Sequence, residues 1–238
     1  MSEANRRSES VTLRALSQAP IRFFFDYISH NAYLAFTRLA LLEARHGRSF
    51  TLEPILFAGL LGHYGQLGPA EVPPKARWMM LDVVRKARRL GVPISPPATH
   101  PFVPLLALRA TFAPLDAEQR HRLVDALFRA VWAESVDATD PREVARVLAA
   151  AGLDGEALVA FAQGTAAKSA LRDATDAAIE AGVFGVPSFL VDGQLFWGFD
   201  DLAHLELFLE GRDPLEPGDA SAFTKYRASA KRRRSAAG

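Results

Sequence analysis

Hydrophobic positions near the start of the chain predict two strands with a helix between them. Residues 21–28 (IRFFFDYI) form a short, aromatic-rich run after a proline, which is typical of a buried strand. From residue 31 to residue 45 apolar residues recur every three or four positions, as on the buried face of a helix, and Gly47 is placed to end it. Residues 49–56 (SFTLEPIL) indicate a second strand. This β-α-β order predicts two parallel strands joined by a right-handed crossover.

The middle of the chain, residues 57–182, has no convincing strand pattern and is predicted to be helical. Glycines, prolines and capping residues divide it into five expected helices. These are a helix ending at Gly91, a short apolar helix within 100–113, a helix starting at Asp116 with Gln119 as in a capping box, a helix from Asp140-Pro141 to Gly152, and a helix over 165–181. The glycines and prolines of residues 62–74 predict a loop that leads into the first of them.

Strand patterns return after the helical region. Residues 188–191 and 195–197 are β-prone runs separated by Asp192-Gly193, a dipeptide typical of a tight antiparallel hairpin. A last helix is expected over 200–209, with Asp200 as its N-cap. The order is therefore β-α-β, a helical insertion, and β-β-α, which predicts an α/β fold.

That order is the order of a thioredoxin-like fold, in which a cis-proline opens the first hairpin strand. Pro187 stands at this point, and a cis X-Pro bond costs only ~0.5–1 kcal/mol more than a trans bond. We expect Val186–Pro187 to be cis; the alternative is a trans-proline that opens an edge strand. The expected organisation is an unordered extension (1–20), a thioredoxin-like domain (21–56 and 183–211), a helical insertion domain (57–182) and a basic tail (212–238).

Composition restricts the chemistry of the chain. None of the 238 residues is cysteine, which excludes disulfides, cysteine-ligated metals and thiol–disulfide exchange by the protein's own side chains. The six histidines have no metal-ligand spacing, so no metal is expected. The net charge of +1 implies no global electrostatic partner, and the basic run at 225–234 is interpreted as an exposed tail rather than a nucleic-acid site. No apolar run of about 18 residues suggests a membrane span, so a cytoplasmic location is expected.

Four motifs occur in order along the chain. They are F-x-F-D-x-x-S ending at Ser29, P-x-K ending at Lys75, G-V-P-S/T-F from Gly185, and F-W-G-x-D ending at Asp200. With these motifs, residues 21–211 resemble the 2-hydroxychromene-2-carboxylate isomerases. That family is related closely to kappa-class glutathione transferases and more distantly to bacterial thiol–disulfide oxidoreductases.

The resemblance implies a bound glutathione whose thiol accepts or donates a hydrogen bond at Ser29. The N-terminus of a helix favours a thiolate, because its backbone N–H groups are free and carry partial positive charge. The alternative role of Ser29 is a plain N-cap, and the two roles are compatible. The other implied contacts are Val186 before Pro187 for the cysteinyl backbone, Lys75 for a carboxylate, Gln66 at a position where asparagine is common, Asp200 for the α-amino group, and Phe199 through its N–H.

His30 stands where the family usually has proline. It is either a base for the thiol proton or a solvated histidine of the first helical turn. The function expected first is a glutathione-dependent isomerase of the 2-hydroxychromene-2-carboxylate type, acting on a small hydrophobic or aromatic substrate and assembled as a homodimer. The alternatives are a kappa-like glutathione transferase or peroxidase, and a thioredoxin-like binding module without catalysis.

Overall fold

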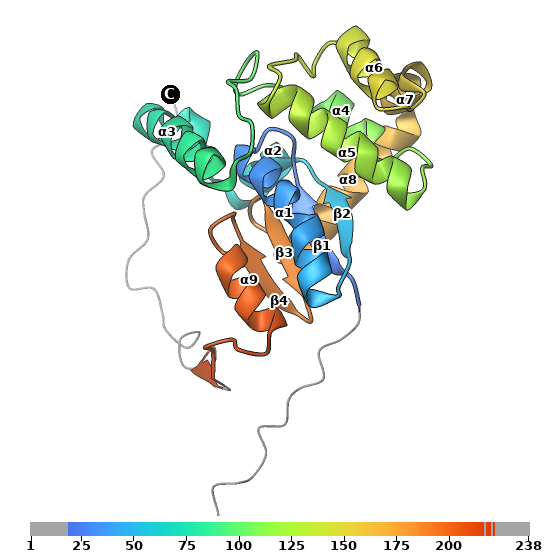
Figure 1. Cartoon of the computed structure of the whole chain (residues 1–238). Coiled ribbons are helices and arrows are strands. Elements are labelled where there is room, and N and C mark those ends of the chain that lie inside the picture. Colours follow the sequence, from blue (N-terminus) through green and yellow to red (C-terminus); the bar gives the residue numbers. More distant parts are fainter. Residues whose placement is uncertain (1–18, 217, 220, 222–238) are drawn as a thin grey trace, which may run out of the picture.

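The expected order of strands and helices is confirmed in the structure, a computed structural model that describes residues 19–216, 218–219 and 221 (Figure 1). The expectations for residues 1–18 and for most of the basic tail lie outside these residues. The sheet has the order β2-β1-β3-β4; β1 pairs in parallel with β2 and antiparallel with β3. The elements of this half are β1 (Ile21–Phe25), α1 (His30–His46), β2 (Phe50–Pro54), β3 (Ser188–Val191), β4 (Gln194–Trp197) and α9 (Leu202–Leu209).

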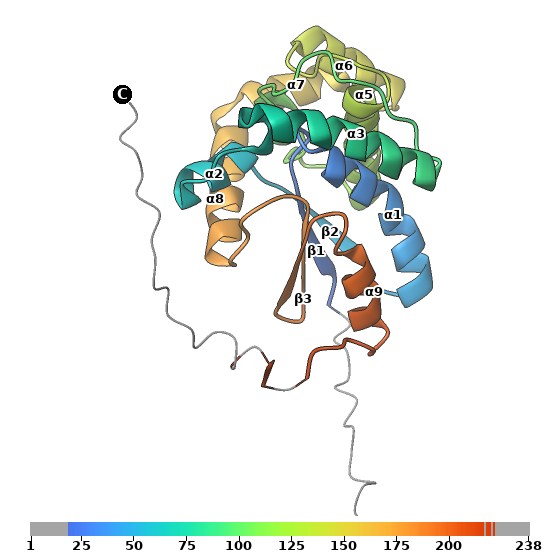
Figure 2. The same ribbon diagram turned by 90° about the vertical axis from the view of Figure 1, so that its left-hand side faces the viewer.

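The aromatic run that predicts β1 is distributed over both faces of the sheet. Phe23 and Phe25 pack in the main core with α1, while Phe24 belongs to a second cluster with Ala178 of α8 (Thr165–Glu180). Figure 2 shows the same arrangement, with α1 and α9 on one side of the sheet and α8 on the other. A run of consecutive apolar residues such as Phe23, Phe24 and Phe25 is buried on both faces of the sheet, because successive side chains point to opposite sides.

The region between β2 and β3 is helical, as expected, but it contains more helices than the five predicted. Its described α-helices are α2 (Phe57–Tyr64), α3 (Pro73–Leu90), α4 (Leu105–Ala110), α5 (Ala117–Trp132), α6 (Pro141–Ala150), α7 (Gly155–Gln163) and α8. The predicted capping box of Asp116 and Gln119 at the start of α5 is confirmed.

Helices α2 and α7 were missed, and each miss has a local reason. Residues 62–64 were assigned to a loop because of their glycine, yet they form the last turn of α2, which ends at Gly65. Glycines at both ends of α7 interrupt its apolar pattern, but the side chain of Asp154 accepts a hydrogen bond from the N–H of Ala157 and caps the helix.

The hairpin is confirmed at the predicted dipeptide, where Asp192 and Gly193 have φ angles of 49° and 83°. The Asp192 carboxylate also accepts a hydrogen bond at 2.9 Å from Arg48, whose side chain is buried. The two halves of the thioredoxin-like region are therefore joined by an ion pair as well as by the sheet.

The predicted N-cap of the last helix was wrong. Helix α9 starts at Leu202, and Asp201 occupies the N-cap position. The Asp201 carboxylate accepts a hydrogen bond at 3.0 Å from the N–H of Trp197 and contacts His204 Nδ1 at 2.7 Å. Two adjacent aspartates made the assignment ambiguous in the sequence. In the part of the chain that the structure describes, no helix has the length and apolar character needed to cross a membrane.

Candidate functional site

A cavity of about 560 Å³ lies where the thioredoxin-like region meets the helical region. Its wall combines the N-termini of α1 and α2, the segment 66–71, the first half of α3, the loop 100–105, and residues 184–186 with Trp197. The structure brings five predicted site residues to this cavity: Ser29, His30, Gln66, Lys75 and Val186.

Ser29 is the N-cap of α1. Its Oγ accepts a hydrogen bond at 3.2 Å from the N–H of Ala32, and its hydroxyl donates to the carbonyl oxygen of Val186 at 3.5 Å. The second contact is at the outer limit of hydrogen bonding. A thiol placed between Ser29 and Val186 has only this weak bond to displace, so the capping role does not prevent a catalytic one.

The Val186–Pro187 bond is cis, as the sequence predicted. Pro187 itself does not line the cavity. The preceding Gly185 is packed so closely that a Cβ atom there would lie 2.3 Å from the indole nitrogen of Trp197. Trp197 therefore lies directly against the backbone that leads into Val186, and its ring packs on Phe184 with centroids 5.1 Å apart.

Asp26 lies beneath the Ser29 turn and was not predicted as a site residue. Its carboxylate oxygens accept hydrogen bonds from the N–H groups of Ile28 at 3.1 Å and Phe57 at 2.9 Å. Burial raises its pKa from 3.8 to about 7, although the two backbone hydrogen bonds act in the opposite direction. The sequence signal that could have indicated this residue was an acid placed among aromatic residues at the end of the first strand, FFFDY. Asp26 links the Ser29 turn to the start of α2.

His30 is buried, so the alternative of a solvated histidine was wrong. Only 3% of its surface is exposed, its ring lies 5.6 Å from that of Trp132, and its Nε2 has no hydrogen-bond partner among the described residues. Burial, with smaller contributions from the neighbouring His100 and Lys86, lowers its pKa from 6.5 to about 4. His30 is therefore a neutral imidazole at neutral pH.

His100 brings a second imidazole to the cavity. It precedes a cis-proline, Pro101, and its Nε2 lies 3.3 Å from the carbonyl oxygen of Ile28. Its ring also packs against Trp132, with centroids 5.6 Å apart. Burial lowers the pKa of His100. The two histidines thus flank one tryptophan of the helical region.

Lys75 and Gln66 lie on the wall formed by α3 and the segment before it. Lys75 is in the first turn of α3, where the partial positive charge of the helix disfavours a cation. No hydrogen bond or ion pair to Lys75 is found within the described chain. Gln66 uses its backbone N–H to close α2 on the carbonyl oxygen of Leu61 at 3.0 Å. Both side chains are exposed and accessible to a ligand.

Phe199 and Asp200 are not brought to the cavity. Asp200 Oδ2 lies 2.7 Å from Lys86 Nζ, and the aspartate side chain is 77% exposed. Lys86 also contacts Asp82 at 2.8 Å and lies 5.5 Å above the ring of Phe199. Asp200 therefore already has a cationic partner.

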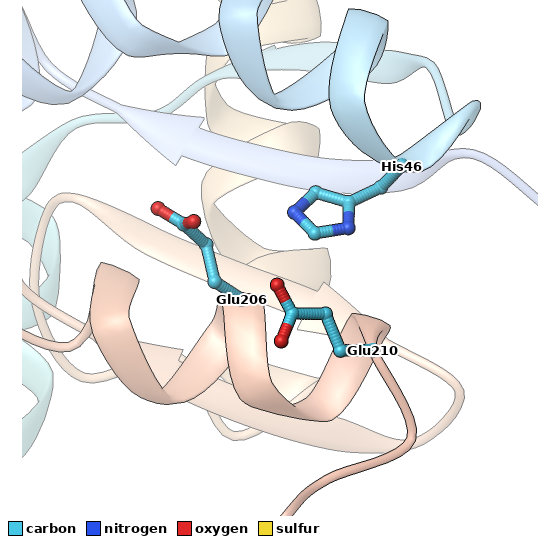
Figure 3. Close-up of side chains that lie close together, drawn as sticks. All are labelled: His46, Glu206 and Glu210. Carbon is cyan, nitrogen blue, oxygen red and sulfur yellow. The ribbon is translucent and has the colours of Figure 1, made fainter.

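One cluster outside the cavity has the residue types of a metal site. His46 at the end of α1 faces Glu206 of α9 and Glu210, the C-cap residue of that helix, and their ligand atoms lie within 4.8 Å of one another (Figure 3). However, Glu206 pairs with Arg45, and Glu210 pairs with Arg212 at 2.9 Å. Because both carboxylates have arginine partners, we interpret this cluster as ionic pairing, in which the Arg45–Glu206 pair joins α1 to α9.

The fold and the cavity define a class of protein: a thioredoxin-like domain with a helical insertion, in which a serine rather than a cysteine caps the first helix. The family model for the DsbA-like thioredoxin domain matches residues 20–210. A 2-hydroxychromene-2-carboxylate isomerase from Sphingobium xenophagum is 34% identical over 191 residues, which are 79% of this chain and 97% of the relative. Human glutathione S-transferase kappa 1 is 27% identical over 78% of this chain and 89% of its own.

A solved structure of 2-hydroxychromene-2-carboxylate isomerase superposes with a TM-score of 0.74 at 28% identity and covers 80% of this chain and 94% of its own. The chain therefore belongs to the DsbA-like thioredoxin family, in the group that contains the 2-hydroxychromene-2-carboxylate isomerases and the kappa-class glutathione transferases. These relatives are enzymes, and they support an isomerase-like or transferase-like role.

Proposed function

We propose that the protein is a glutathione-dependent isomerase of the 2-hydroxychromene-2-carboxylate type. The observation that carries the proposal is the joint position of the Ser29 hydroxyl, the N-terminus of α1 and the Val186 backbone on one cavity wall. When bound, glutathione supplies a thiolate that adds reversibly to an unsaturated carbonyl, so that a former double bond is free to rotate.

The residues of the cavity fit the thiol end of glutathione and one of its carboxylates. Ser29 donates its hydroxyl hydrogen to the sulfur in place of the 3.5 Å contact with Val186, and the first N–H groups of α1 favour the anion. The backbone of Val186, before the cis bond, pairs with the cysteinyl unit as an added strand does. Lys75 attracts a carboxylate and Gln66 offers an amide beside it.

The two residues proposed for the amino end of glutathione, Phe199 and Asp200, lie outside the cavity wall. Asp200 forms an ion pair with Lys86 and does not line the cavity, and Phe199 has no polar side chain. Binding through Asp200 therefore requires the ammonium group of the ligand to share or replace Lys86. A role for Asp200 and Phe199 stays a proposal, as do the homodimer and the cytoplasmic location.

The second candidate is a kappa-like glutathione transferase or peroxidase, which the kappa-class relatives favour. Product analysis separates it from the isomerase, because a transferase leaves glutathione on its product and an isomerase returns it. A binding module without catalysis, the third possibility, predicts affinity for a ligand but no turnover.

Replacing Lys75 with alanine is expected to raise the dissociation constant for glutathione about three- to tenfold. The effect is limited because an exposed charge pair is screened by solvent. Isothermal titration calorimetry measures it. Lys168→Ala removes an exposed lysine of α8 outside the cavity and serves as the matched control. Equal affinities in Lys75→Ala and Lys168→Ala would argue that glutathione binds elsewhere.

A further inference from the structure

We propose that the acceptor substrate of this cavity is an uncharged aromatic carbonyl compound rather than a carboxylate. The inference rests on the proposed function and narrows its substrate class. It differs from what the names of the isomerase relatives suggest, since those enzymes are named for a carboxylate.

The charges on the described cavity wall carry the inference. Lys75 is the one lysine or arginine of that wall, and the proposed function assigns it to glutathione. Glu71, whose Oε1 accepts a hydrogen bond at 2.6 Å from the N–H of Gly68, also lines this wall. The carboxylate of Asp26 is fully buried and is bound to the backbone N–H groups of Ile28 and Phe57. Once glutathione is bound, a substrate carboxylate finds Glu71 on this wall and no unused lysine or arginine.

The histidines of the cavity do not replace the missing cation. His30 and His100 are both largely buried, and burial disfavours the charged imidazolium in each. Lys86, whose positive charge acts on His30, forms ion pairs with Asp82 and Asp200. A carboxylate that enters this part of the cavity therefore loses its hydration without gaining an ionic partner, which is strongly unfavourable.

A neutral carbonyl group suits the same wall. The buried Nε2 of His30 has no partner within the described structure, and a neutral imidazole can donate or accept one hydrogen bond at low cost. The remaining wall is apolar and suits an aromatic ring. It is formed by Phe57, Leu61, Met79, Phe102 and Leu105 among others.

A matched pair of unreactive probes tests the charge preference. Benzylacetone and benzylpyruvate share the phenyl ring, the linker and the ketone, and they differ in a methyl group against a carboxylate. With glutathione at saturation, calorimetry is expected to show benzylacetone binding at least about tenfold more tightly to the full-length protein, because the acid pays for desolvation. Equal or tighter binding of benzylpyruvate, or no binding of either probe, overturns the inference.

A variant pair adds a gain-of-binding test. Val103 is a rim residue of the cavity with 62% of its surface exposed, so substitution there has little effect on folding. Val103→Lys is expected to tighten benzylpyruvate binding about three- to fivefold and to leave benzylacetone unchanged. Methionine is similar to lysine in length but carries no charge, so Val103→Met is expected to leave the binding of both probes unchanged. A Lys variant that behaves like the Met variant contradicts the inference.

Titration with glutathione alone tests the proposed function separately from the substrate class. If glutathione does not bind, the proposed function fails, whatever the probes do. If glutathione binds and benzylpyruvate still exceeds benzylacetone, the proposed function stands and only the substrate class is wrong.

Discussion

Replacing Ser29 with glycine is expected to slow turnover at neutral pH about 10- to 100-fold, while glutathione affinity changes little. The hydroxyl contributes one hydrogen bond to a charged sulfur, worth ~1.5–3 kcal/mol, whereas the other contacts of the tripeptide remain. The pKa of the bound thiol is expected to rise, which ultraviolet thiolate absorbance measures against pH. Glycine is preferred over alanine because it replaces an N-cap serine at a cost of only a few tenths of a kcal/mol.

The control for Ser29→Gly is a cap that lies outside the cavity. Asp154→Ala removes the side-chain cap of α7 and is expected to cost about 1 kcal/mol of stability without affecting the thiol or the rate. If Ser29→Gly keeps both the parent thiol pKa and the parent rate, Ser29 is a helix cap and no more. His30 is then the next residue to test as a base for the thiol proton.

The stability of the protein is expected to depend on pH through two buried groups that act in opposite directions. The folded state raises the pKa of Asp26 from 3.8 to about 7, so its contribution is full below pH 3.8 and is lost as the pH rises through about 7. The folded state lowers the pKa of His30 from 6.5 to about 4, so its contribution is full above pH 6.5 and is lost as the pH falls through about 4. Between about pH 4 and pH 6.5 the two nearly cancel.

Single substitutions are expected to reveal how each of the two groups makes the free energy of unfolding depend on pH. In Asp26→Asn the free energy of unfolding should rise by about 3 kcal/mol relative to the parent profile between about pH 4 and pH 6.5, because His30 remains. In His30→Gln it should fall by about 3 kcal/mol relative to the parent between about pH 4 and pH 6.5, because only Asp26 then titrates. Urea unfolding at a series of pH values measures both.

Asp173→Asn, which neutralises an exposed acid of α8, is the control for these profiles and should run parallel to the parent. A parent-like profile for Asp26→Asn would show that Asp26 does not titrate in this range. A parent-like profile for His30→Gln would show that His30 is not held neutral by the fold.

Residues that act through local chain geometry could be predicted from the sequence. The Ser29 turn follows from a strand that meets a helix, the hairpin from Asp192-Gly193, and the cis bond from the position of Pro187 in the thioredoxin-like order. For the turn and the hairpin the neighbours along the chain determine the backbone, so a short segment contains the information; the cis bond needed the order of strands as well.

Residues that act through distant partners could not be predicted. Nothing near Asp200 in the sequence indicates Lys86, which is 114 positions away and takes its carboxylate. Likewise, Asp26 reaches the backbone of Phe57, which begins a helix that the sequence pattern did not reveal. His30 was expected in solvent because the helical region that buries it, through Trp132, is contributed by another part of the chain.

The central position of β1 affects how the protein is made on the ribosome. Strand β1 is paired on one side with β2, which follows it closely, and on the other with β3, where Phe23 faces Phe189. During synthesis β3 emerges only after the whole helical region, so one edge of a largely apolar strand, with Arg22 as its one charged residue, lacks its partner for most of translation. Unpaired apolar edges promote aggregation. We therefore expect nascent chains that stop before β3 to be strong clients of ribosome-associated chaperones, and chains that extend past β4 to be released from them.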